Sequence, residues 1–398
     1  MKRFVTAMCV ILLALILTGN AIDLSAAASP TGYHALASRD VGLDALRQPF
    51  APPLGNSSPP LKPLGFSEVN SLTLNPGENN LNTAVIDAAN GFAYFGTGTM
   101  PGSVVQVRLS NFTRAGVLNV GVPGLNAATI DTTNGFAYFG STAFPANVVK
   151  VRLSNFTLDN TLTLNTGEDA LRSAVIDTVN GFAYFGTFTS PGKVVKVRLS
   201  DFTRVDALTL NTGEDRLVSA VIDSANGFAY FGAFSAPPGK IVRVRLSNFT
   251  RVDALDVSDN TNVACAVIDP AAGFAYFCGG STPDRVLKVR LSDFSLVSTL
   301  TLNAGENTLK SAVIDTANGF AYFGTDTQPG KVVVVRLSDF TRWGAITLNP
   351  GENSLLSAVI DTSNASAPIA YFGTDTSPGI VVKIDAKISQ LYLPLVIR

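Results

Sequence analysis

One phrase of about 46 residues recurs seven times along this 398-residue chain, and it limits the fold more than any other feature. The copy at 311–353 reads "SAVIDTANGFAYFGTDTQPGKVVVVRLSDFTRWGAITLNPGEN". Its first aspartate marks the copies, with spacings of 44 and then five times 46 residues: Asp87, Asp131, Asp177, Asp223, Asp269, Asp315 and Asp361. Repeats of about 40–50 residues that hold four short strands are typical of β-propeller blades. The repeat therefore predicts an all-β chain.

Each repeat is predicted to form four strands. In residues 173–211 these are "SAVID", "FAYFGT", "VVKVRLS" and "TRVDALTLN", which are rich in the residues that strands prefer. The first turn ends in Asn-Gly, which accepts the positive φ of a tight hairpin, and a Pro-Gly turn precedes the third strand. A repeat is thus expected to be a four-stranded antiparallel meander.

The two ends of the repeat array complement each other. Residues 66–80, "FSEVNSLTLNPGENN", match the phrase of a fourth strand, although no first three strands precede them. The last repeat ends its third strand at "IVVKIDA" and lacks a fourth. We therefore predict that the N-terminal strand completes the last blade and closes a seven-bladed ring over 64–387, which removes open sheet edges.

The segments outside the ring indicate export. Lys2 and Arg3 precede an apolar run at 4–17, and small residues follow up to Ala28, so 1–28 is predicted to be a signal peptide. The run is shorter than the roughly 20 residues that span a bilayer, so we expect no transmembrane span after cleavage; a retained anchor is the alternative. Residues 29–63 are a proline-rich, largely irregular linker, and 388–398 are an apolar C-terminal tail for docking or sorting. The expected location is secreted or cell-surface.

Composition and motifs argue against several functions. Only 15% of the residues are charged and the net charge is −1, so the basic footprint of a nucleic-acid binder is missing. The sole histidine, His34, precedes the ring, and no G-x-S-x-G, phosphate-loop or Cys/His motif occurs. The sequence therefore predicts no catalytic residues, no metal ligands, no cofactor and no enzyme activity. Calcium on rim carboxylates is an alternative that no EF-hand-type spacing supports.

The order "FAYFGT", "VVKVRLS", "TRVDALTLN" resembles the YVTN repeat propellers of bacterial and archaeal surfaces, and more distantly the NHL-like and lactonase-like propellers. The resemblance covers residues 66–386. It departs from the family in the third strand, where six repeats end in "VRL" and only "VVKIDA" keeps the family's usual phrase. The resemblance implies a seven-bladed fold and an extracytoplasmic binding or surface role. It carries over no catalytic residue set.

Departures from the repeat are the best indicators of a site. In a propeller, the loops between strands four and one share a face with those between strands two and three. In the latter loops the repeat places Phe144, Phe188, Phe234, Asp326 and Asp375. Exposed aromatic residues on one rim indicate contact with a partner or glycan, whereas loops that bury their own Phe are the alternative.

Residues that recur in every blade are interpreted as structural. The aspartate that ends the first strand is expected to bond nearby turn amides, and the Arg of "VRL" to pair locally or cover apolar surface. The rim glutamates of "LNxGE" are expected to cap their own turns: Glu78, Glu168, Glu214, Glu306 and Glu352.

The fifth repeat replaces a Ser and a Gly by Cys265 and Cys278. Counting outward from the turn at 270–273 places these cysteines opposite each other, within the reach of a disulfide. Cys9 would leave with the signal peptide, so the mature chain would hold an even number of cysteines. We predict a Cys265–Cys278 disulfide.

These observations together predict a secreted or cell-surface scaffold that binds a protein or glycan on the face of those loops without catalysis. Two alternatives stay open. One is a glycan-directed hydrolase or lyase that uses acidic rim residues, and the other is a purely structural surface-layer component.

Overall fold

The computed structural model describes residues 66–388, apart from 236, 258–261 and 280–281. Contacts divide the chain into two units, 1–60 and 61–398. The predicted signal peptide, the predicted linker and all but one residue of the predicted tail lie outside the described residues, so those interpretations stay predictions.

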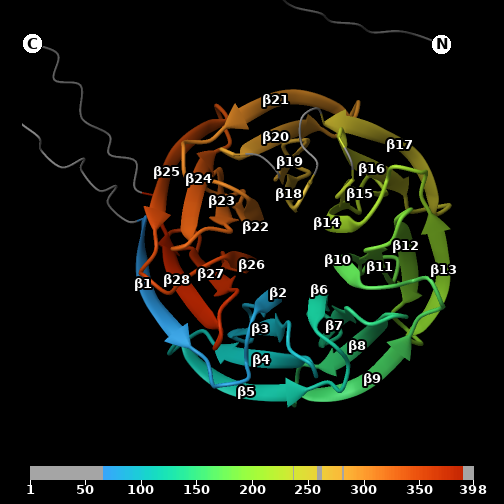
Figure 1. Ribbon diagram of the computed structural model, residues 1–398, viewed down its shortest axis with the longest axis horizontal. Helices are drawn as coiled ribbons and strands as arrows, with labels where there is room; N and C mark the ends of the chain where they lie inside the picture. Colours follow the sequence, from blue (N-terminus) through green and yellow to red (C-terminus); the bar gives the residue numbers. More distant parts are fainter. Residues whose placement is uncertain (1–65, 236, 258–261, 280–281, 389–398) are drawn as a thin grey trace, which may run out of the picture. The chain divides into compact units, whose positions relative to one another are not determined.

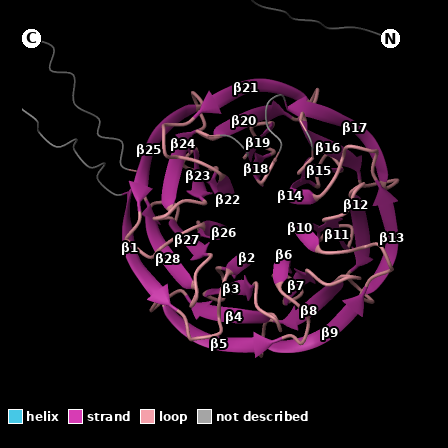
Figure 2. Ribbon diagram, in the orientation of Figure 1, coloured by secondary structure: helices cyan, strands magenta, loops and turns pink. Residues whose placement is uncertain are grey.

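The described residues form seven four-stranded antiparallel sheets arranged as blades in a ring (Figure 1). Residues from the innermost strand of every blade line a central channel. The described residues contain strands and loops and no helix (Figure 2). This arrangement confirms the predicted all-β, seven-bladed propeller with four-stranded antiparallel blades.

The strand bounds follow the repeat. Blade 1 comprises β2 (Leu81–Asp87), β3 (Phe92–Thr97), β4 (Ser103–Arg108) and β5 (Thr113–Asn119); blade 2 comprises β6 (Leu125–Asp131), β7 (Phe136–Ser141), β8 (Asn147–Arg152) and β9 (Thr157–Thr163). Blade 3 comprises β10 (Leu171–Asp177), β11 (Phe182–Thr187), β12 (Lys193–Arg198) and β13 (Thr203–Thr209); blade 4 comprises β14 (Leu217–Asp223), β15 (Phe228–Ala233), β16 (Gly239–Arg245) and β17 (Thr250–Val257). Blade 5 comprises β18 (Cys265–Asp269), β19 (Phe274–Cys278), β20 (Arg285–Arg290) and β21 (Ser295–Thr301); blade 6 comprises β22 (Leu309–Asp315), β23 (Phe320–Thr325), β24 (Lys331–Arg336) and β25 (Thr341–Thr347). Blade 7 comprises β26 (Leu355–Asp361), β27 (Ile369–Thr374), β28 (Ile380–Ala386) and β1 (Phe66–Thr73).

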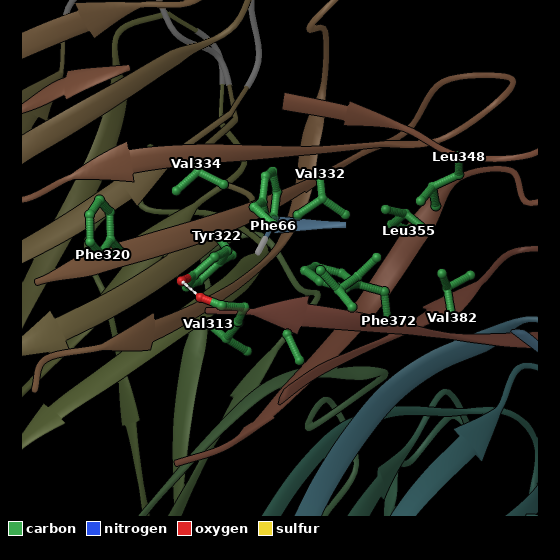
Figure 3. Close-up of a cluster of buried hydrophobic side chains, with 13 residues drawn as sticks. Phe66, Val313, Phe320, Tyr322, Val332, Val334, Leu348, Leu355, Phe372 and Val382 are labelled. Carbon is green, nitrogen blue, oxygen red and sulfur yellow. Dashed lines mark hydrogen bonds between the residues drawn. The ribbon is translucent and has the colours of Figure 1, made fainter. Parts of the chain in front are cut away.

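The N-terminal strand closes the ring as predicted. β1 pairs antiparallel with β28, and Phe66 lies opposite Ala386. The ring of Phe66 is 2% exposed and packs among side chains of blades 6 and 7 (Figure 3). In the same cluster the Tyr322 hydroxyl donates to the Ala386 carbonyl at 2.6 Å. The two ends of the array are therefore joined by both backbone pairing and packing.

One aromatic contact holds every pair of adjacent blades together. The tyrosine in the second strand of one blade contacts a phenylalanine of the next blade, with ring centroids 5.5–6.0 Å apart. This phenylalanine lies at the start of the outer strand or in the turn just before it. At the closing junctions the pairs are Tyr322–Phe66 and Tyr371–Phe112. Tilted pairs at this spacing are favourable beyond the area that they bury. The repeated tyrosines are thus core residues at every blade junction.

The repeated aspartates and the VRL arginines are structural too. Asp87 accepts hydrogen bonds from the Asn90 backbone at 3.2 Å and from the Asn90 amide at 2.7 Å, which fixes the turn between the first two strands. Arg198 pairs with Asp201 at 3.0 Å within its own blade, whereas Arg245 has no ion pair among the described residues and lies over the Phe228 ring. These observations confirm the predicted local roles.

Candidate functional site at the channel mouth

Two sets of loops meet on one face of the propeller. The loop between the second and third strands of a blade bonds to the loop that leads from its outer strand into the next blade. For example, the Gly192 amide donates to the Glu214 carbonyl and the Gly330 amide donates to the Glu352 carbonyl, both at 2.8 Å. The predicted sharing of a face is confirmed, and we call this the loop face.

The innermost strands lie at the centre of the ring (Figure 1), and residues from all seven of them line the central channel. Each begins with a buried leucine except in blade 5, and the pairing of the first two strands shifts at the next residue, as between Leu171 and Ser173. A bulge of this kind leaves one residue outside the ladder and re-aims its side chain. The bulged residues are Asn82, Asn126, Arg172, Val218, Lys310 and Leu356.

All six bulged residues line a cavity of about 320 Å³ at the mouth of the channel. Its other lining residues are Asn262, Ala264, Asp326 and Asp375. The flanking leucine, small residue and "VID" hardly change from blade to blade, whereas the bulged position holds amide, cationic and aliphatic side chains. The mouth is therefore the part of the channel whose chemistry differs most around the ring.

The basic side of the mouth is a cluster of two arginines and two phenylalanines, which we call the cation–aromatic cluster. The rings of Phe188 and Phe234, from neighbouring blades, lie nearly parallel at 11° with centroids 6.4 Å apart. The Arg172 guanidinium lies 4.9 Å from the Phe188 ring. The Arg216 guanidinium lies 5.3 Å from Phe188 and 5.6 Å from Phe234. Contacts of this length between guanidinium and ring are attractive.

Two asparagines extend this side of the mouth. The Asn126 amide lies between Asn82 and Arg172, within hydrogen-bonding distance of both. The loss of surrounding water at the mouth lowers the pKa of Arg172, which nevertheless stays cationic at neutral pH. The result is a row of two amides and one guanidinium along the bulged positions of blades 1 to 3.

The acidic side of the mouth lies in blades 6 and 7. Asp326 and Asp375 occupy matching loop positions, and both line the cavity. Partial burial, and then the neighbouring charge of Asp326, raise the pKa of Asp375. The two carboxyl groups are therefore close enough to interact electrostatically, and they form one acidic element.

The structure brings together four of the five predicted ligand-binding residues at or beside the mouth, and separates the fifth. Phe144 is 78% exposed and directly precedes Pro145. The matching position in blade 3 is Ser190, whereas Phe188 lies two residues earlier in its loop. Met100 occupies the Phe144 position in blade 1 and is 82% exposed. Phe144 thus pairs with Met100 as an exposed loop tip, and whether any of the five binds a ligand stays a proposal.

Sequence reasoning missed Arg172, Arg216, Lys310 and the asparagines. The signal that could have found the bulged ones is the single variable position within "L-x-S-A-V-I-D". Arg216 gave no such signal, because its contacts with Phe188 and Phe234 depend on how blades 3 and 4 pack.

The rim glutamates cap their turns, as predicted, and four of them do more. Glu168 accepts from the Asn165 backbone amide at 3.0 Å. Both of its carboxylate oxygens also accept hydrogen bonds from the Nε of Arg204, at 2.8 and 3.0 Å. Arg204 belongs to the next outer strand along the ring. The same ion pair recurs as Glu78–Arg114, Glu214–Arg251 and Glu306–Arg342. These glutamates are buried and paired, so they are structural residues rather than ligand-facing ones.

Cys265 and Cys278 lie directly opposite each other in β18 and β19, with Cα atoms 5.1 Å apart, and are joined by a disulfide. The arrangement is the one that register counting predicts.

The described residues contain no group of three or more His, Cys, Asp or Glu side chains placed to hold a metal ion. No helix in the described part of the chain is long and apolar enough to cross a membrane.

Comparisons with known proteins support the fold. No family model and no curated protein matches the sequence. Among solved structures, the hydrazine synthase of Kuenenia stuttgartiensis is similar to this chain with a TM-score of 0.67 and 10% identity, over 80% of this chain and 98% of that one. At this identity the likeness shows the fold alone.

The same comparison contradicts the prediction that the chain is not an enzyme, because a protein named as an enzyme contains this fold. The physical reason for the error is that the prediction searched for His, Ser and Cys motifs within the repeat. Propeller chemistry can instead be assembled from loop side chains that no sequence motif connects. The neighbour's activity is not thereby assigned to this chain.

Proposed function

We propose that this chain is an extracytoplasmic ligand-binding propeller of the YVTN type, and that its ligand binds at the channel mouth on the loop face. One observation supports this most directly: six β-bulges point the most variable residue of the inner strand into one shared cavity. Ligand sites commonly occupy such concave positions, with a few convergent polar groups.

The proposed location outside the cytoplasm draws on two independent features. The charged, apolar and small-residue order of 1–28 is that of a secretory signal peptide. The Cys265–Cys278 disulfide suits an oxidising compartment, since cytosolic thiols are kept reduced.

The acidic pair supports a second candidate function, namely acid–base chemistry on a bound glycan. A carboxyl group with a raised pKa beside an ionised carboxylate is a common arrangement of a general acid and its partner. The pKa of Asp375 is raised, Asp326 lies beside it, and both face the cavity.

The test is a screen of the purified propeller against glycans and surface proteins, with product analysis of every mixture, followed by blocking variants. Val218→Trp fills the mouth, whereas Val179→Trp places the same ring on an 88% exposed turn of the opposite face. We expect Val218→Trp to lower the affinity for a captured ligand at least about tenfold, or roughly 1.4 kcal/mol. Val179→Trp should leave it unchanged. Equal affinity in both variants would place the ligand elsewhere. Product formation that Asp375→Asn abolishes would favour the second candidate.

A further inference from the structure

We infer that the cation–aromatic cluster is an oxyanion-binding subsite, and that the ligand of the channel mouth is an acidic oligosaccharide whose carboxylate or sulfate binds Arg172 and Arg216. The inference rests on the proposed function and specifies its ligand.

Arg172 and Arg216 have no counter-charge among the described residues. Nine arginines in the described part of the chain pair with a carboxylate, at 3.0 Å or less: Arg114, Arg152, Arg198, Arg204, Arg243, Arg251, Arg290, Arg336 and Arg342. No ion pair involving Arg172 or Arg216 is present within that part. Both instead lie against phenylalanine rings on the loop face. Their positive charges are therefore available to a ligand.

The aromatic rings hold the two guanidinium groups in place. A ring that covers a guanidinium contacts its π-face and does not occupy the N–H groups at its edge; at Arg172, part of that edge also faces the Asn126 amide. Those edges match a carboxylate or sulfate with two parallel hydrogen bonds. Phe188 lies against both arginines, and Phe234 adds a second ring to Arg216. The cluster thus restricts two long side chains before any ligand arrives, which lowers the entropy cost of binding.

The mouth has a basic side and an acidic side. Arg172 belongs to blade 3, on the far side of the channel from blades 6 and 7, which carry the acidic pair (Figure 1). The acidic pair repels an anion and so favours its placement beside blades 3 and 4. Lys310 also lines the mouth and adds a positive charge on the blade 6 side.

The neutral groups next to Arg172 favour a sugar as the carrier of the anion. The Asn82 and Asn126 amides each offer donors and acceptors that suit hydroxyl groups. Phe234 and Phe188 are half-buried, so part of each ring is open to the apolar C–H face of a sugar. An oligosaccharide that carries an acidic group uses all three kinds of side chain.

The experiment is calorimetric titration of the full mature chain with trigalacturonate, its fully methyl-esterified form, a sulfated disaccharide and sodium sulfate. We expect an acidic sugar to bind at least about tenfold more tightly than the ester, because hydrogen bonds to charged groups contribute about 1.5–3 kcal/mol. Arg172→Gln should remove this preference and leave the affinity for the ester unchanged.

Arg245→Gln is the matched control. The Arg245 guanidinium also lies over a ring, 5.0 Å from Phe228, and has no ion pair within the described residues, but it is at the opposite face. The Arg245→Gln variant should bind every probe with the affinity of the parent protein. A thermal midpoint measured for both variants separates loss of binding from loss of folding.

The outcomes are distinguishable. Preference for the uronate or for the sulfated sugar supports the inference and identifies the anion. Equal binding of acid and ester at the mouth would overturn it while the proposed function stands. Three other results would also overturn it. Sodium sulfate could bind as tightly as either sugar, or Arg172→Gln and Arg245→Gln could have equal effects. The third is that no probe binds.

Discussion

At the scale of single residues, the rim glutamate and the arginine that meets it are retained or lost together at six of the seven junctions; the exception is the closing junction, where Glu352 is retained without an arginine. Where the second and fifth repeats lack the "LNxGE" glutamate, the arginine position holds Leu158 and Leu296. At the closing junction the arginine position holds Glu68, to which the Asn349 amide donates at 2.7 Å. This paired variation within one chain is what a specific ion pair between successive outer strands requires.

Removing one partner of such a pair should cost more than removing an exposed pair. Arg204→Met would leave Glu168, which is 3% exposed, without its cation, so we expect a loss of about 2 kcal/mol in the free energy of unfolding. Arg198→Met, from a pair whose side chains are both more than 40% exposed, should cost less than about 0.5 kcal/mol. Urea unfolding of both variants measures the difference. Equal losses would mean that the buried pair contributes no more than a surface one.

Residues whose contacts depend on local register could be predicted from the sequence, whereas residues positioned by a bulge or by the packing of two blades could not. The Cys265–Cys278 pairing followed from counting along a hairpin, and the turn role of Asp87 from its position at a strand end. Both depend only on local register. The aim of Arg172 into the channel depends on a bulge, and the contact of Arg216 with Phe188 depends on the packing of two blades. Neither leaves a periodic pattern in the sequence.

At the scale of the element, the hairpin of the first two strands accepts either of two residue pairs. Most blades place a Ser opposite a Gly, as Ser173 opposite Gly186. A Cβ on Gly186 would lie 2.3 Å from the Ser173 Oγ and 2.7 Å from the Leu217 Cβ, so no larger residue fits beside an unchanged serine. Blade 5 has a covalently joined pair of cysteines at the same register. The serine–glycine pair and the disulfide are therefore alternative ways to fill one space.

This equivalence predicts that the disulfide can be transplanted. The double variant Ser173→Cys/Gly186→Cys should form a second disulfide in blade 3, because its register is that of β18 and β19. Gly186→Cys alone should lower the free energy of unfolding by about 1–3 kcal/mol through overpacking. Thiol labelling of the unreduced double variant should find no reactive thiols in the mature chain. Two labelled thiols would show that the blades differ in geometry more than their registers indicate.

At the scale of the whole molecule, the ring depends on contacts between residues far apart in the sequence. Five of the seven aromatic junctions join consecutive repeats, whereas Tyr322–Phe66 and Tyr371–Phe112 bring together residues from opposite ends of the array. Phe66 also begins the strand that covers the edge of β28. Without β1, blade 7 would expose a strand edge and a buried aromatic pocket, which together promote aggregation.

The position of β1 in the sequence should matter less than its presence in the ring. In a circular permutant, residues 366–386 would precede 66–363, and a Ser-Asp linker would join them as in the other outer turns. This order puts β1 directly after β28. The new chain ends lie in an exposed turn of blade 7. We expect the permutant to be monomeric, with a thermal midpoint within about 5 °C of the parent, since a change of about 1 kcal/mol shifts the midpoint of large domains by a few degrees. Deletion of 66–73 should instead lose at least about 3 kcal/mol, the scale for removing one buried Phe, and form aggregates. Size-exclusion chromatography and circular dichroism melts measure both. A deletion variant that melts like the parent would mean that six complete blades hold the seventh without its outer strand, and that closure by β1 contributes little to the stability of the ring.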